Sequence, residues 1–382
     1  MNLFKKFTSL GLAATMALTV TGCNLSAPTT VGNIGGVEIP AGVYLLAQYN
    51  AYNSASSVAE LATGETASDV KAVLKATCSG TIGEEEVTAT GAEYVEKLTM
   101  RSLEYYAAVE NTFEQLGGVL DDAATAEAAA TADSLWTSNG DLYTANGIGK
   151  ESVLNYLLNA EKAQACMELI YGEGGSEEVS DADYTAYVED ECRYLDTLQF
   201  SLIDYNTYAM AGEEQAEQIR ALAQQAADSL NEQATAETSA SDVYFNLYMA
   251  ASEYLPQAYQ AMGASFDMNQ LPYFFGSQLY HADDLSSFEN EDGSNDLTDP
   301  LDAAGKGKWI VLDLGYNILV VRDSDPFAYQ TLDELKTSAD LLNAMKSEEV
   351  QERFYNEGAA LEQALNQSAM NTYKASKIKK TV

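Results

Sequence analysis

Few residues in this chain of 382 are suited to chemistry. His281 is the only histidine, and the four cysteines are Cys23, Cys78, Cys166 and Cys192. A multi-histidine metal site and a Ser-His-Asp triad away from residue 281 are therefore strongly disfavoured, because both need imidazole. His281 itself has two interpretations, an acid/base or substrate contact and a solvated loop residue. The second is favoured because two aspartates follow closely.

The cysteines are read separately from the histidine. Without Cys23, three remain, and an odd number implies no complete disulfide framework. Cys166 and Cys192 fall in helical patterns that suit packed thiols, although one bridge among Cys78, Cys166 and Cys192 stays open in an exported protein.

Two acid-rich stretches could coordinate a cation. They are residues 84–86, three consecutive glutamates, and residues 289–299, which include Glu289, Glu291, Asp292, Asn295 and Asp296. The second lacks the fixed ligand order of an EF-hand loop, so a solvated loop is favoured. We predict no metal and no cofactor.

The aromatic run Tyr273-Phe274-Phe275 is the best candidate for binding a substrate. Aromatic side chains offer apolar area with few rotatable bonds, which suits the recognition of an apolar peptide. The same residues would also serve as the core of a small domain. Both interpretations stay open.

The N-terminus has the pattern of an export signal. Lys5 and Lys6 precede a short apolar stretch, residues 10–20, that is too short to span a bilayer permanently. The stretch ends in Val-Thr-Gly-Cys at residues 20–23, which resembles a bacterial lipobox. We therefore predict a signal peptide over 1–22, a lipidated Cys23, a tether over 23–30, and a protein anchored on the extracytoplasmic face of the membrane. The alternative is an ordinary signal peptide cut near Ala27.

Charge limits the possible partners. The chain has 20 Lys and Arg residues against 58 Asp and Glu residues, a formal net charge of -38. That balance argues against nucleic acid and against electrostatic attraction to anionic lipid, so acyl chains would hold the protein at the membrane. The C-terminal lysines could touch lipid or a wall polymer, but a solvated terminus is favoured. These lysines are Lys374, Lys377, Lys379 and Lys380.

Hydrophobic periodicity predicts a mainly helical chain. Strand signals occur over 31–40, which has a Gly-Gly turn, and over 198–203, 309–314 and 316–321. Residues 54–90 read as helix fragments and loops. Helices are predicted over 94–116, 121–135, 152–171, 213–233, 243–254, 332–346 and 350–367, and Ser180 is expected to cap a further helix.

This order of elements predicts an α+β fold, mainly α, in three segments. Residues 31–192 would form an N-terminal helical segment, residues 193–325 a small inserted α+β domain, and residues 326–382 returning helices. The last helices have no partner of their own, so we expect them to pack on the first segment.

Three stretches together resemble the PrsA/SurA family of extracytoplasmic foldases. VGNIGGVEIPAGVY at 31–44 resembles the family's opening strand-turn-helix. YGEGGSEEVSDADYTAYVEDE at 171–191 resembles its linking segment, and GYNILVVRDSDPFAYQTLDELKTSADLL at 315–342 resembles its last parvulin strand and returning helix. The resemblance implies a chaperone module built from both chain ends, with a parvulin-type prolyl isomerase domain inserted between them.

The parvulin pattern is degenerate in this chain. Phe200 and Asn317 stand where the resemblance implies histidines, and Tyr273, Phe274 and Phe275 resemble the family's aromatic loop. Because imidazole is absent, we predict no efficient isomerisation and no catalytic residue. The predicted function is a membrane-anchored chaperone or foldase that binds unfolded secreted polypeptides. The alternatives are an active parvulin-type peptidyl-prolyl cis-trans isomerase and a solute-binding lipoprotein, which would need two parallel sheets.

Overall fold

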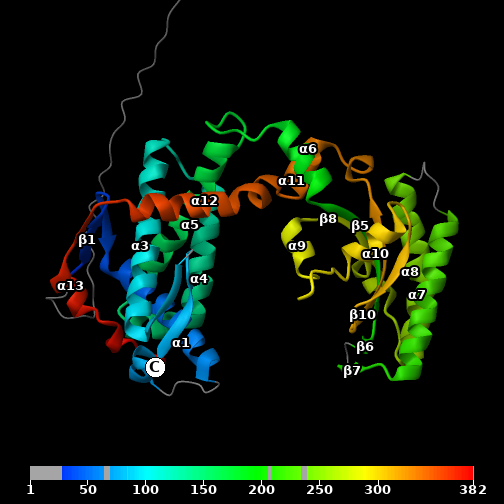
Figure 1. The fold of residues 1–382 in the computed structure, drawn as a ribbon, viewed down its shortest axis with the longest axis horizontal. Helices are drawn as coiled ribbons and strands as arrows, with labels where there is room; N and C mark the ends of the chain where they lie inside the picture. The colour runs from blue at the N-terminus through cyan, green and yellow to red at the C-terminus, as the bar shows by residue number, and fades with distance from the viewer. Residues whose placement is uncertain (1–27, 64–68, 84, 205–207, 234–238, 382) are drawn as a thin grey trace, which may run out of the picture. The chain divides into compact units, whose positions relative to one another are not determined.

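The structure is a computed structural model that describes residues 28–63, 69–83, 85–204, 208–233 and 239–381 (Figure 1). The predicted signal peptide, Cys23 and most of the tether lie outside these residues, as does Glu84. Among the described helices, none combines the length and apolar character needed to cross a membrane.

The described chain forms two compact units, which we call the split unit and the central unit. The split unit contains the residues up to Cys166 and those from Glu349 onward, and the central unit runs over Met167–Glu348. Both boundaries fall inside helices. The boundaries predicted at residues 192 and 325 mark changes in sequence pattern instead, and they stay predictions.

The split unit is mainly helical. Two of its helices, α5 and α12, continue into the central unit. Its strands are β1 (Thr30–Ile34), β2 (Val37–Pro40), β3 (Thr77–Ile82), β4 (Glu85–Thr90) and β11 (Gln363–Leu365). Its helices are α1 (Ala41–Thr63), α2 (Val70–Lys75), α3 (Gly91–Gln115), α4 (Asp122–Ala145), α5 (Lys150–Tyr171), α12 (Leu341–Ala359), α13 (Gln367–Thr372) and the short η3 (Ala375–Lys377).

Two long helices form the centre of this unit. α1 packs on α3, and the side chains of Tyr52 on α1 and Leu103 on α3 are almost completely buried. The α3 helix starts at a capping box, in which Thr90 accepts from the Glu93 backbone and the Glu93 carboxylate accepts from the Thr90 backbone. The two bonds satisfy backbone donors that have no partner at a helix start.

A three-stranded antiparallel sheet joins the two ends of the described chain. β1 lies between β2 and β11, and Gly32 is opposite Leu365. Gly32 has φ of 111°, and a Cβ there would lie 2.4 Å from the Ala364 carbonyl oxygen. Only glycine therefore allows the last strand to approach this closely.

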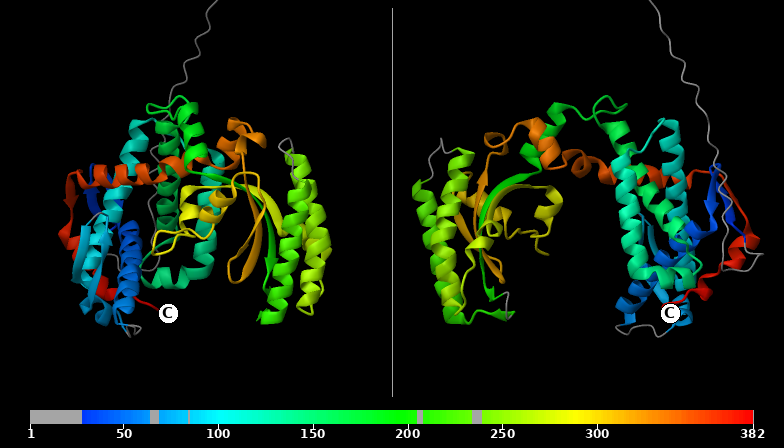
Figure 2. Two further views of the ribbon diagram at one scale, coloured as in Figure 1. Left: turned by 45° about the vertical axis from the view of Figure 1, so that its right-hand side comes forward. Right: turned by 180° about the vertical axis from the view of Figure 1, so that it is seen from behind.

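The central unit is a small α+β domain. Its four-stranded antiparallel sheet has the order β8-β5-β10-β9, and α7 and α8 pack against each other and cover one face (Figure 2). Its strands are β5 (Arg193–Ser201), β6 (Ile203–Asp204), β7 (Ala209–Met210), β8 (Phe275–Tyr280), β9 (Ile310–Asp313) and β10 (Asn317–Ser324). Its helices are α6 (Asp181–Asp190), α7 (Glu213–Gln233), α8 (Ala240–Ala261), α9 (Ala282–Ser286), α10 (Thr298–Ala304) and α11 (Leu332–Ser338), with the short η1 (Met268–Tyr273) and η2 (Pro326–Ala328).

The α+β, mainly α class is confirmed by these elements, and most predicted helices and strands occur. Several predictions are wrong. Residues 77–90 form the β3–β4 hairpin rather than loops and helix fragments. The helix predicted over 332–346 is two helices, because α11 ends at Ser338 and α12 begins at Leu341, and the helix predicted over 350–367 ends at Ala359. In the last case residues 363–365 pair with β1, so hydrogen bonding to a distant strand overrides the local helical pattern.

The α4 helix runs ten residues beyond the predicted end at Leu135. Its second half contains polar residues and Gly140, which weaken helical periodicity in the sequence. Tyr143 in that half is buried, in a cluster with Leu46, Ile148 and Val153. Tertiary packing therefore extends the helix past its local signal.

Candidate functional site

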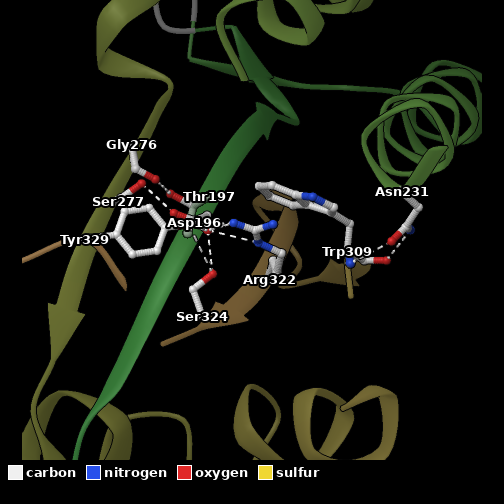
Figure 3. Close-up of polar contacts among 9 residues, drawn as sticks. All are labelled: Asp196, Thr197, Asn231, Gly276, Ser277, Trp309, Arg322, Ser324 and Tyr329. Atoms are coloured by element: carbon white, nitrogen blue, oxygen red, sulfur yellow. Dashed lines mark hydrogen bonds and ion pairs between the residues drawn. The ribbon is translucent and has the colours of Figure 1, made fainter. Parts of the chain in front are cut away.

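A buried carboxylate lies at the centre of the sheet in the central unit (Figure 3). Asp196 on β5 is 0% exposed, and its Oδ1 accepts a 2.5 Å hydrogen bond from the Ser277 hydroxyl on β8. Its Oδ2 accepts from Nε and Nη2 of Arg322 on β10, at 3.0 and 2.6 Å. The hydroxyls of Ser324 and Tyr329 also donate to Oδ2, at 2.6 and 2.9 Å. We call these five residues the carboxylate network.

Neighbouring rings enclose the network. The Arg322 guanidinium lies 5.0 Å from the ring centre of Trp309, and Tyr329 stacks on Tyr194 with centroids 4.9 Å apart. Burial is the main cause that raises the pKa of Tyr329 to about 12, so its phenol stays protonated and donates at neutral pH. The network joins three strands of the sheet through hydrogen bonds. Because Asp196 has no solvent access, its carboxylate is not positioned to act on a substrate.

The strand register separates the two positions at which histidines were implied. Phe200 pairs with Ile318, and Asn317 pairs with Ser201. Directly opposed residues share a face of a sheet and successive residues alternate, so Phe200 and Asn317 lie on opposite faces. Phe200 is buried among α7 and α8, whereas Asn317 shares its face with Ser201.

Asn317 has an unusual environment. Its Oδ1 is buried and has no hydrogen-bond partner among the described residues. A lone amide with a fully buried Phe200 on the other face does not form an acid/base pair. The geometry therefore provides no general acid or base at the positions taken from the resemblance.

The helix α8 carries an exposed aromatic surface that was not predicted from the sequence. Tyr244, Phe245, Tyr248 and Met249 are 56%, 60%, 42% and 49% exposed. They form two i, i+4 pairs, which places them along one side of the helix. We call these four residues the α8 aromatic surface. Their spacing in the sequence was a usable signal, because α8 has apolar residues on both of its sides.

The opposite side of α8 explains why this surface stays open. Val243, Leu247, Ala251 and Leu255 are buried in the core that α8 forms with α7 and the sheet. Packing therefore buries one apolar side of the helix and leaves the second side largely exposed, apart from ring contacts of Tyr244 and Tyr248 with Phe275. Contiguous exposed apolar side chains of this kind often mark interaction sites.

The predicted aromatic run is divided between surface and core. Tyr273 is 85% exposed, whereas Phe275 is 7% exposed and Phe274 is partly buried in the same core. Phe275 supports the α8 aromatic surface, because the rings of Tyr244 and Tyr248 lie with centroids 5.3 and 6.3 Å from it. The core interpretation thus fits Phe274 and Phe275, and only Tyr273 is available to a ligand.

His281 is neither in the aromatic surface nor fully solvated. Its ring stacks on Tyr187 with centroids 6.0 Å apart, and its Nδ1 lies 3.3 Å from the Tyr187 hydroxyl and 3.8 Å from the Cys192 sulfur. Burial is the main cause that raises the pKa of Cys192 to about 12. Because a thiol with that pKa stays protonated at neutral pH, this trio does not form a nucleophile and base.

The remaining candidate residues have structural roles. Cys78, Cys166 and Cys192 are all free and buried. In the described ranges, no three His, Cys, Asp or Glu side chains are grouped to hold a metal ion. Within residues 289–299, Asp292 and Asn295 accept hydrogen bonds from loop backbone amides. Glu84 of the first acidic stretch lies outside the described residues.

Comparison with solved structures finds a distant structural likeness. No family model matches the chain, and no curated protein matches it. A crystal structure of the foldase protein PrsA from Streptococcus pneumoniae is similar over 78% of this chain and 100% of its own, with 11% sequence identity and a TM-score of 0.37. A likeness of that size does not support an argument about function.

Proposed function

We propose that the protein is a membrane-anchored extracytoplasmic chaperone that holds non-native segments of exported polypeptides. The observation that carries the proposal is the α8 aromatic surface, four large side chains left exposed by a helix whose other side is packed. An unfolded segment exposes apolar side chains in no fixed order. Tyrosine, phenylalanine and methionine suit such a partner, because they give apolar contact without demanding one sequence.

The charge of the chain is consistent with a holding role. A formal net charge of -38 keeps copies of the protein apart by repulsion, even though each copy exposes apolar side chains. The lipobox-like sequence before Cys23 supports attachment at the outer face of a membrane, where exported chains emerge unfolded. Both arguments are independent of the α8 aromatic surface.

The two alternatives have less support. An active prolyl isomerase needs polar groups converging on one pocket, but the register puts Phe200 and Asn317 on opposite faces of the sheet. A solute-binding lipoprotein would need parallel sheets, and every strand pairing among the described residues is antiparallel. No feature of the described residues specifically favours either alternative.

Suppression of aggregation tests the proposal. The mature chain is mixed with a chemically unfolded protein that aggregates on dilution, and light scattering is followed. The variant Phe245→Ser with Met249→Ser removes two members of the α8 aromatic surface without opening the core, because both side chains are about half exposed. We expect this variant to need several-fold more protein for the same protection, since the apolar contact area with the client falls.

The matched control changes apolar side chains elsewhere on the surface. Val119→Ser with Leu169→Ser removes two side chains that are 86% and 42% exposed and that lie outside α8. This control should protect the client as well as the wild type does. Equal protection by both double variants would show that α8 is not the binding surface, and no protection by the wild type would reject the chaperone proposal itself.

A further inference from the structure

A small pocket in the split unit has an unusual charge for this chain. It has a volume of about 280 Å³ and lies between α1, the end of α4 and the C-terminal segment. Its lining includes Lys374, Lys377 and Lys379 together with Tyr49 and Asn146, and no carboxylate lines it. In a protein with 58 acidic residues, three lysines around one acid-free pocket form a local positive site. We call it the strap pocket.

The C-terminal segment is held in place over the pocket. The Asn146 side chain donates to the Lys379 carbonyl at 3.0 Å and accepts from the Lys379 amide at 2.8 Å. Ala375 and Ile378 pack against the core that contains Val73 and Cys78. The lysines are therefore fixed in position by the backbone, which lowers the entropic cost of binding an anion.

The lysine ammonium groups remain available to a ligand. All three side chains are exposed, and none of them forms an ion pair among the described residues. Lys377 donates one hydrogen bond to the Thr372 carbonyl at 2.8 Å, which leaves its other protons for a ligand. Glu96 lines a separate pocket that Lys374 also lines, and the side chain of Asp69 caps α2.

Two more lysines extend this positive region. Lys71 and Lys75 are exposed on α2, which packs against η3. Repulsion from the rest of the acidic surface does not cancel the local attraction, since salt screens charges beyond about 8 Å at physiological ionic strength. The net charge of the chain therefore does not decide how this region behaves.

The start of the described chain lies beside the same segment. The Tyr373 hydroxyl donates a hydrogen bond to the carbonyl of Pro28. Cys23 is five residues before Pro28, and five residues span at most about 17 Å. A lipid attached to Cys23 would therefore keep the strap pocket close to the membrane surface.

We propose that the strap pocket binds the phosphate headgroup of an anionic membrane lipid. This inference rests on the lipid-anchor part of the proposed function. A basic site beside the acyl chains on Cys23 adds electrostatic attraction to an anionic membrane surface. Lys374, Lys377 and Lys379 bind the phosphate oxygens, and Asn146 keeps the segment over the pocket.

Vesicle binding by the mature chain tests the inference. The protein starts at residue 23 and carries Cys23→Ser, so that no acyl chain contributes. It is sedimented with phosphatidylcholine vesicles that contain either about 30% phosphatidylglycerol or none. We expect binding only to the anionic vesicles, and we expect it to weaken as salt is added. Lys374→Gln with Lys379→Gln should lower that affinity about tenfold or more.

The control removes the same charge from another surface. Lys306→Gln with Lys308→Gln neutralises two exposed lysines of the central unit and should leave vesicle binding unchanged. Circular dichroism checks that both variants fold. Absence of binding to anionic vesicles, or equal loss in the two variants, would overturn the inference. Inorganic phosphate or a soluble poly(glycerol phosphate) that displaced the protein at concentrations matching the lipid phosphate would also overturn it, by assigning the pocket to a free phosphate.

Aggregation suppression separates this inference from the chaperone proposal. The aggregation assay contains no membrane, so the lysine variants should protect the unfolded client as well as the wild type does. A protein that protects its client but ignores anionic vesicles would retain the proposed function and lose the strap-pocket inference.

Discussion

At the scale of single residues, the main feature of the central unit is the ion pair between Asp196 and Arg322. Both side chains are buried. Besides its partner, Asp196 accepts three hydrogen bonds, from Ser277, Ser324 and Tyr329, and Arg322 donates one to the Tyr329 hydroxyl. Breaking a buried pair leaves one charge without compensation, which costs far more than breaking an exposed pair. The sequence held a signal for this pair, because a charged residue inside an apolar strand usually needs a buried partner.

A matched pair of variants measures this difference. Arg322→Met keeps most of the side-chain volume but leaves the Asp196 carboxylate buried without its cation, so we expect a loss of about 3–5 kcal/mol in unfolding free energy. Arg220→Met breaks the exposed pair with Asp313 and should cost less than about 1 kcal/mol. Urea denaturation followed by circular dichroism gives both values. Similar losses in the two variants would show that the buried pair is not a main support of the sheet.

At the scale of elements, the sequence predicted the helices whose apolar periodicity and capping residues are sufficient to form them. The helix predicted over 213–233 is α7, with Ile219 and Leu230 buried, and Ser180 caps α6 in a capping box as predicted. The β3–β4 hairpin was missed because its sequence is rich in Ser, Thr, Gly and Glu, which are typical of loops. The three-residue β11 was missed because it exists only through pairing with β1.

The candidate sites also divide into those that the sequence could predict and those that depend on tertiary packing. The aromatic run at 273–275 was recognised from its composition, but whether each ring is exposed depends on packing against α8. The α8 aromatic surface could have been predicted from the i, i+4 pairs Tyr244 with Tyr248 and Phe245 with Met249. The strap pocket could not, since it needs residues near 49, 146 and 374 to meet in three dimensions.

Pairing between β1 and β11 gives a test at this scale. Gly32→Ala places a methyl group against the Ala364 carbonyl, whereas Gly36→Ala has a similar positive φ but nothing within 4 Å of the new methyl. The backbone strain is shared by the two variants, so their difference reports the close approach of β11. We expect Gly32→Ala to be less stable than Gly36→Ala by about 1–3 kcal/mol, measured by urea denaturation.

A second measurement locates the damage. Release of β11 should free the backbone around the C-terminal lysines, which a protease must bind in extended form, so trypsin should cleave Gly32→Ala there faster than Gly36→Ala. Equal stability and equal cleavage in the two variants would contradict the role assigned to Gly32.

At the scale of the whole molecule, the excess of acidic residues is the dominant physical property. A formal net charge of -38 on a folded chain is a source of self-repulsion, which is relieved when the chain unfolds. Salt screens this repulsion more in the compact state, because the charges lie closer together there. Stability should therefore rise with ionic strength.

Calorimetry at two salt concentrations checks this expectation. Raising sodium chloride from about 10 to about 200 mM should raise the melting temperature by a few degrees, because the Debye length shortens from about 30 to about 7 Å. The same increase in osmolality supplied by sucrose is the control for effects unrelated to charge. A melting temperature that fell with added salt would show that attractive ion pairs outweigh the repulsion.

The pairing of β1 with β11 also has a consequence for the order in which the protein matures. β1 is among the first described strands to be synthesised, but its neighbour on one side is contributed by residues 363–365. Until translation reaches them, β1 presents a row of backbone groups with no partner on that side. The central unit has no such dependence, since all of its sheet lies between residues 193 and 324. A newly made chain would therefore complete its middle before its beginning, and a prematurely terminated chain would carry an open strand edge that proteases and other unfinished chains can reach.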